Sequence, residues 1–201
     1  MADAPSPSRI VTLPNLVTVV RLSCLPVFLW LLFARENRAA AAWLLAGMGA
    51  TDWVDGCLAR RLHQVSELGK ILDPVADRLL FIVGAGGILL DGSVPVWFAA
   101  IVLVRETVVG GTTILLAWLG ARRIDVTWFG KAGTFMLMVS FPFFLASHST
   151  LGWADTAGVL AWVFGLPGLV LSLYAAVLYV PLARRALAEG RADRRTAASS
   201  A

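Results

Sequence analysis

The sequence predicts an all-α integral membrane protein with six transmembrane helices. The first reason is composition, because 58% of the 201 residues are hydrophobic and only 15% are charged, whereas soluble domains carry about 25% charged residues. The second reason is that the apolar residues gather into six segments, each near or above the roughly 20 residues with which a helix crosses a bilayer. These segments are Pro14–Phe33, Ala39–Leu58, Ile71–Leu90, Val94–Leu119, Trp128–Ser147 and Thr156–Ala183.

Each segment has a feature that supports its assignment. In the first, Pro14 suits the first turn of a helix, where its missing N–H is harmless. No signal-peptide pattern follows Met1, so we expect this helix to be retained. The second and third segments flank a polar stretch, the fourth holds Arg105 beside Glu106, and the fifth holds Lys131 near its start. Glycines at seven positions suit close helix packing. They are Gly47, Gly49, Gly84, Gly86, Gly87, Gly110 and Gly111.

The basic residues predict the orientation of the chain. Twelve of the 17 lysines and arginines fall on one side of the predicted helices or in the C-terminal tail, and only Arg35 and Arg38 fall on the other side. The positive-inside rule then places both termini in the cytoplasm of a multi-pass cell-membrane protein. We expect a disordered segment at residues 1–8, a six-helix transmembrane domain at 9–189 that holds the functional residues, and a basic, disordered cytoplasmic tail at 190–201.

Four aspartates lie close together at the predicted cytoplasmic turn between the second and third helices. Asp52 and Asp55 are spaced i, i+3, and Asp73 and Asp77 are spaced i, i+4. Both spacings put a pair on one helix face, and a short turn between antiparallel helices would bring the two faces together. Carboxylates at membrane depth are costly and functional by default. Four of them would repel one another unless protonated or bound to a cation.

Hard oxygen ligands on two helices suit Mg²⁺ or Mn²⁺. The small residues Gly56, Ala59 and Gly69 would leave room for a bulky ligand beside the metal. Arg60 would offer a forked donor to a phosphate or a polar base. The sequence therefore predicts a metal site that takes a phosphate-bearing substrate.

Eight residues of this region resemble the signature of the CDP-alcohol phosphatidyltransferases, with every position matched. They are Asp52, Asp55, Gly56, Ala59, Arg60, Gly69, Asp73 and Asp77, in the pattern D-x2-D-G-x2-A-R-x8-G-x3-D-x3-D. The six-helix layout is similar as well. The resemblance implies the CDP-alcohol phosphotransferase fold and an enzyme that makes a phosphodiester lipid and CMP from CDP-diacylglycerol and an alcohol.

The resemblance also implies a role for each matched position. Two divalent ions, Mg²⁺ or Mn²⁺, would lie between the aspartates and the pyrophosphate. The implied metal ligands are Asp52, Asp55, Asp73 and Asp77, and Asp77 would also be the general base. The implied nucleotide pocket consists of Asn15, Asp52, Asp55, Gly56, Ala59, Arg60 and Gly69. A homodimer is implied too.

Two further stretches resemble the branch of the family with glycerol-type acceptors. They are Thr12–Leu22 and Phe129–Pro142, the latter taken together with Val104–Glu106. Overall the chain resembles the actinobacterial cardiolipin synthases most, which implies a phosphatidylglycerol acceptor, and then the phosphatidylglycerophosphate synthases, which use glycerol 3-phosphate. Arg21, Arg105 and Lys131 are the candidates for binding the acceptor. The alternative for Arg105 is an internal ion pair with Glu106, and the alternative for Lys131 is an interfacial lysine whose charge reaches out to water.

Two other functions remain open from the residues alone. A membrane prenyltransferase also uses paired aspartates with Mg²⁺, but its acidic motifs lie on well-separated loops. A cation transporter would spread its acids through the membrane, whereas here, apart from Glu106, they cluster at one turn. The net charge of +4 fits basic cytoplasmic loops and a tail that binds anionic lipids, and we expect no nucleic-acid partner.

Overall fold

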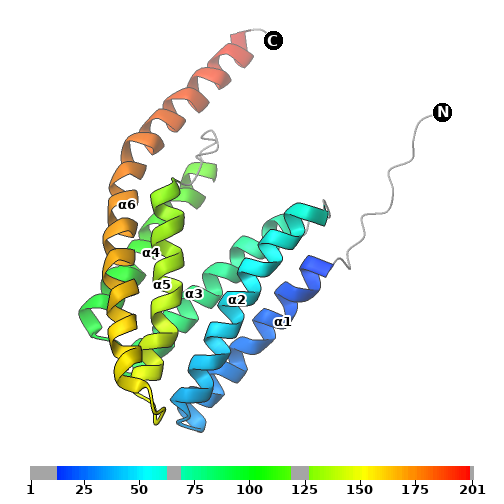
Figure 1. The fold of residues 1–201 in the computed structure, drawn as a ribbon. Coiled ribbons are helices and arrows are strands. Elements are labelled where there is room, and N and C mark those ends of the chain that lie inside the picture. Colours follow the sequence, from blue (N-terminus) through cyan, green and yellow to red (C-terminus); the bar gives the residue numbers. More distant parts are fainter. Residues whose placement is uncertain (1–12, 63–68, 119–126, 200–201) are drawn as a thin grey trace, which may run out of the picture.

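The computed structural model describes residues 13–62, 69–118 and 127–199, and all of the regular structure in these ranges is helical. Six α-helices follow one another in the ranges that the structure describes (Figure 1). They are α1 (Leu13–Leu29), α2 (Arg38–Leu62), α3 (Gly69–Asp91), α4 (Val96–Trp118), α5 (Trp128–Ser147) and α6 (Ala154–Ser199), and a π-helical turn, η1 (Trp30–Ala34), extends α1. The predicted all-α class is confirmed, and the helices cover the six apolar segments.

Three of the described helices are long and apolar enough to cross a bilayer. These stretches are Val96–Leu116, Trp128–Ser147 and Ala154–Ala183, and Thr18–Ala34 forms a shorter apolar helix. Helices α2 and α3 carry the acidic residues at one end, which lowers their apolar content. The chain is therefore a membrane protein with several apolar helices, and crossings by α1, α2 and α3 stay a prediction.

Successive helices run in alternating directions, so the helix ends gather at two opposite ends of the molecule (Figure 1). Helix α1 begins, α2 ends, α3 begins, and α6 ends at the same end of the molecule (Figure 1). We call this the aspartate end, because α2 and α3 carry the four aspartates there. The two halves of the predicted site are thus brought to one end by the up-and-down course of the chain.

A close backbone contact joins α5 and α6. A methyl group at Gly133 would lie 2.7 Å from the backbone nitrogen of Ser172, and one at Gly168 would lie 3.0 Å from the backbone nitrogen of Leu137. These distances are too short for any side chain, so both glycines let the two backbones approach. Beside this contact, α4 contributes Phe98 to the core, where its ring packs against those of Phe144 and Trp162.

At the end opposite the aspartates, an ion pair joins α2 to α3. Nε of Arg38 donates to Oδ2 of Asp91 at 2.9 Å, and the Ser93 hydroxyl donates to the same oxygen. The hydrogen bond to Asp91 raises the pKa of Arg38 further above its ordinary value, so the pair stays charged. This link holds together the far ends of the two helices that carry the aspartates.

The C-terminal tail differs from the prediction. We expected disorder from residue 190, but α6 continues to Ser199 and runs past the other helices (Figure 1). Its last part is rich in alanine and arginine, which are strong helix formers. High intrinsic helix propensity therefore outweighs the polar composition that suggested disorder. The predicted disordered segment 1–8 lies outside the described residues.

Candidate active site

The eight signature residues all lie on α2, which ends at the aspartate end, and on α3, which begins there. Asp52, Asp55, Gly56, Ala59 and Arg60 are on α2, and Gly69, Asp73 and Asp77 are on α3. Because both stretches are helical, the i, i+3 and i, i+4 spacings do place each aspartate pair on one helix face. The side chains of these eight residues, and that of Asn15 on α1, are not among those that the structure describes, so their individual roles stay predictions.

The donor chemistry fits a divalent metal. Among the side chains that are described, no three histidines, cysteines, aspartates or glutamates gather into a metal site, so the four aspartates remain the candidate donors. Carboxylate oxygens on two helices that reach the same end of the molecule (Figure 1) are ligands that Mg²⁺ and Mn²⁺ favour.

Two adjoining cavities are both lined by Arg78, the residue that follows Asp77 in the sequence. The first, of about 160 Å³, is lined by Arg21, Arg78, Leu80, Phe81, Glu106, Thr134 and Met138; we call it the α1 cavity, because Arg21 comes from α1. The second, of about 190 Å³, is lined by residues that include Arg78, Arg105, Glu106, Thr134 and Tyr179; we call it the α6 cavity, because Tyr179 comes from α6. The two cavities share Arg78, Glu106 and Thr134, which form the wall between them.

Arg105 is tied into this wall by two hydrogen bonds. Its Nη1 donates to Oε2 of Glu106 at 2.7 Å, and its Nε donates to the backbone oxygen of Ser172 at 3.2 Å. Both charged side chains are largely buried, at 10% and 15% exposed. The internal pair that was one interpretation of Arg105 is therefore present, and Arg105 lines the α6 cavity as well.

Three arginines and one glutamate are thus among the described residues that line the two cavities. The α6 cavity also carries hydroxyl groups, and the Thr113 and Tyr179 oxygens lie 3.1 Å apart, joining α4 to α6. Guanidinium and hydroxyl donors that line the same cavity suit an anionic, hydroxylated ligand such as a glycerol phosphate group.

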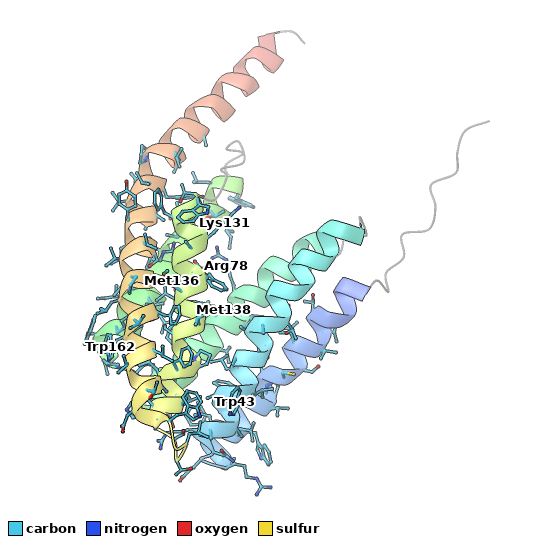
Figure 2. All side chains as sticks on the ribbon, in the orientation of Figure 1. Trp43, Arg78, Lys131, Met136, Met138 and Trp162 are labelled. Carbon is cyan, nitrogen blue, oxygen red and sulfur yellow. The ribbon has the colours of Figure 1, made fainter. Side chains whose placement is uncertain are left out.

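The three predicted acceptor residues do not all converge. Arg21 and Arg105 line the two adjoining cavities, but Lys131 is exposed and belongs to the lining of neither. On α5 the cavity-facing positions are Gly130, Thr134 and Met138, which are spaced by four residues, and Lys131 is displaced around the helix from that face. Figure 2 shows Lys131 near the start of α5, on a different level from Arg78.

Sequence reasoning did not single out Arg78 or Thr134 as acceptor residues, and it included Met138 only as part of the stretch Phe129–Pro142. Arg78 directly follows the last signature aspartate, and Thr134 and Met138 continue the face of Gly130 at i+4 and i+8. These signals were present in the sequence. They acquire meaning only once the face of α5 that looks toward α3 and α4 is known.

A third cavity, of about 620 Å³, lies between α2 and α5 and is almost wholly apolar. Its lining is Ala42, Trp43, Leu45, Ala46, Gly49, Ala50, Phe135, Met138, Val139, Pro142, Phe143, Ala146, Leu151 and Trp153. Ala50 lies two residues before Asp52, so the cavity reaches close to the aspartate end. Met138 lines both this apolar cavity and the α1 cavity, and Figure 2 shows it on the part of α5 that neighbours α2.

Comparison with known proteins accounts for this combination of elements. Residues 11–186 match the protein family described as "CDP-alcohol phosphatidyltransferase". The "Cardiolipin synthase (CMP-forming)" of Streptomyces coelicolor is 38% identical over 183 residues, covering 88% of this chain and 85% of that protein. The "CDP-diacylglycerol–glycerol-3-phosphate 3-phosphatidyltransferase" of Escherichia coli is 31% identical over 179 residues, covering 86% of this chain and 94% of that protein. The chain, which carries its four aspartates on α2 and α3 and has arginine-lined cavities, belongs to the CDP-alcohol phosphatidyltransferase family.

Proposed function

We propose that the protein transfers the phosphatidyl group of CDP-diacylglycerol to phosphatidylglycerol, forming cardiolipin and releasing CMP. Family membership supports the reaction class. The choice of a lipid acceptor is supported by one observation above all, which is that Met138 lines both the apolar cavity and the arginine-lined α1 cavity.

This shared residue matters because a phospholipid acceptor has two unlike parts. Its phosphodiester needs cationic donors, which Arg21 and Arg78 supply in the α1 cavity. Its acyl chain needs an apolar path, which the cavity between α2 and α5 supplies. From Ala50 to Ala42 that path follows about two turns of α2, or about 12 Å at 1.5 Å per residue. A polar site that adjoins an apolar one of this size is typical of pockets for amphipathic ligands.

The aspartates of α2 and α3 would hold the catalytic metal. Asp52, Asp55 and Asp73 would be ligands, with Asp77 contributing to the same site, and two Mg²⁺ or Mn²⁺ ions would fit such a set. When bound, these ions would neutralise the charge that develops on the pyrophosphate and on the departing CMP. Asn15, Gly56, Ala59, Arg60 and Gly69 would shape the nucleotide pocket.

The chain's own residues would orient the acceptor and manage its proton. The acceptor phosphate would be held beside the N-terminal half of α3 by Arg21, Arg78 and Arg105. A carboxylate oxygen of Asp77 would take the proton of the acceptor hydroxyl. The hydroxyl oxygen then bonds to the phosphorus that carries diacylglycerol, the bond from that phosphorus to the CMP oxygen breaks, and CMP leaves with the electron pair.

Glycerol 3-phosphate is the second candidate acceptor. The observation that favours it is the small size of the α1 and α6 cavities, about 160 Å³ and 190 Å³, with three arginines around them. Such a site suits a compact ligand with nearly two negative charges. It would leave the larger apolar cavity to the acyl chains of the donor.

We further propose that the active site and both termini face the cytoplasm and that the enzyme works as a homodimer. The distribution of basic residues supports the orientation. An even number of helices, with α1 beginning and α6 ending at one end (Figure 1), agrees with termini on the same side. The dimer rests on the family resemblance.

Purified protein tests the proposal directly. It is given CDP-diacylglycerol and Mn²⁺ with phosphatidylglycerol in one reaction and glycerol 3-phosphate in another, and CMP and lipid products are measured. We expect CMP and cardiolipin from phosphatidylglycerol. If only glycerol 3-phosphate gives product, glycerol 3-phosphate is the acceptor and the reaction class stands. If neither acceptor gives CMP, both the proposed acceptor and the proposed reaction class are wrong.

A further inference from the structure

Gly110 on α4 lies directly beneath the guanidinium group of Arg78. A methyl group at Gly110 would lie 1.2 Å from Nη1, 2.3 Å from Cζ and 2.9 Å from Nη2 of Arg78. Carbon atoms of side chains do not approach other heavy atoms so closely, so the guanidinium occupies the space that any other residue at 110 would fill. Gly110 has no positive φ, and backbone freedom does not explain the glycine.

The neighbouring glycine has no such contact. A methyl group at Gly111 would meet nothing within 4 Å, although it lies in the same helix and is the next residue. General helix packing therefore does not explain Gly110 either, because the atoms nearest to it belong to one flexible side chain and not to the backbone of another helix. Gly133 shows the contrasting case, in which backbone atoms of α6 are the neighbours.

The guanidinium of Arg78, packed against Gly110, is in a position to bind a ligand. It lines both the α1 and the α6 cavity. No hydrogen bond or ion pair joins it to another residue in the described part of the chain, since Glu106 accepts from Arg105. Its five N–H donors are thus available at the wall between the cavities. A cation inside a membrane protein is costly without a partner, and an anionic ligand in either cavity would supply one.

We propose that Gly110 is a positioning residue that holds the guanidinium of Arg78 between the two cavities, where it donates to the phosphate of the acceptor. This inference rests on the proposed function, because it takes the ligand of these cavities to be the acceptor. A larger residue at 110 would push the end of Arg78 away from the wall. Since that end is flexible, the fold would adjust at little cost and the effect would fall on the acceptor.

Gly110→Ala and Gly111→Ala form a matched pair of variants for the test. Both replace a glycine of α4 by the strongest helix former, so any gain in helix propensity is shared. The measurements are kcat and KM for the acceptor, KM for CDP-diacylglycerol, and the thermal unfolding temperature. We expect Gly110→Ala to raise the acceptor KM on the order of tenfold, as for the loss of a charge-assisted hydrogen bond, with KM for CDP-diacylglycerol and the unfolding temperature little changed. Gly111→Ala should behave as the wild type.

A second pair separates positioning from simple crowding of the cavity. In an Arg78→Lys background the guanidinium is absent, so adding Gly110→Ala should raise the acceptor KM no further. Equal acceptor KM values for Gly110→Ala and Gly111→Ala would overturn the proposal, as would a loss of unfolding temperature without a change in acceptor KM. An undiminished effect of Gly110→Ala in the Arg78→Lys background would overturn it too. The acceptor used is whichever one the wild type turns over, so the result is independent of the choice between phosphatidylglycerol and glycerol 3-phosphate. A wild type without CMP release from any acceptor would instead contradict the proposed function.

Discussion

Arg105 on α4 donates from Nε to the backbone oxygen of Ser172 on α6, at 3.2 Å, while its Nη1 holds Glu106 at 2.7 Å. One guanidinium therefore pairs with a largely buried carboxylate and links two helices. Ser172 is also the residue whose backbone contacts Gly133 of α5. Arg105 is in this way connected to the close contact between α5 and α6.

Removing Arg105 should destabilise the protein through Glu106. Arg105→Met keeps much of the side-chain volume but leaves a largely buried carboxylate without its partner, which we expect to cost about 3 kcal/mol of unfolding free energy. Thermal unfolding in detergent measures the loss. Adding Glu106→Gln removes the uncompensated charge and should recover much of the stability. A single variant as stable as the wild type would contradict the pairing as a stabilising feature.

Gly133→Ala should weaken the contact between α5 and α6. The added methyl group would lie 2.7 Å from the backbone nitrogen of Ser172, and backbone cannot move aside as a side chain can, so we expect a loss of about 1–3 kcal/mol. Gly86→Ala on α3 is the control, since nothing lies within 4 Å of a methyl group there. Comparison of the two unfolding temperatures decides the matter. Equal temperatures would show that the helices separate without penalty.

Activity should depend on a divalent metal. The four aspartates of α2 and α3 would repel one another without a cation, and CMP release should need one to neutralise the pyrophosphate. We expect EDTA to abolish CMP release and excess Mg²⁺ or Mn²⁺ to restore it. A parallel sample in zwitterionic detergent without EDTA is the control, because it shows how much CMP release is lost when lipid alone is removed. Full activity in EDTA would rule out the metal site.

Asp77→Asn should affect the chemical step. The amide keeps the shape of the side chain but cannot accept the acceptor's proton, so we expect kcat to fall on the order of 10²–10⁴-fold, with binding of CDP-diacylglycerol partly retained. Single-turnover measurement of CMP release separates chemistry from binding. Near-normal turnover would remove Asp77 from the role of base.

The sequence by itself determined the helices and the candidate metal site. Apolar runs of bilayer length and the spacing of the aspartates are local properties, and each helix forms within its own stretch of chain. The range Trp128–Ser147 was predicted without error for this reason. The C-terminal tail shows the limit of composition alone, because its polar residues suggested disorder while its alanines and arginines favour the helix that ends at Ser199.

Only the tertiary structure decided which cations meet. Arg21, Arg78 and Arg105 come from three helices, and their convergence depends on how those helices are rotated and how closely they cross. Lys131 has a suitable charge but lies off the face of α5 that carries Thr134. The packing of Arg78 against Gly110 likewise joins residues of α3 and α4. Helix rotation is set by contacts such as that of Gly133 with Ser172, which act between segments far apart in the chain, and no local pattern records them.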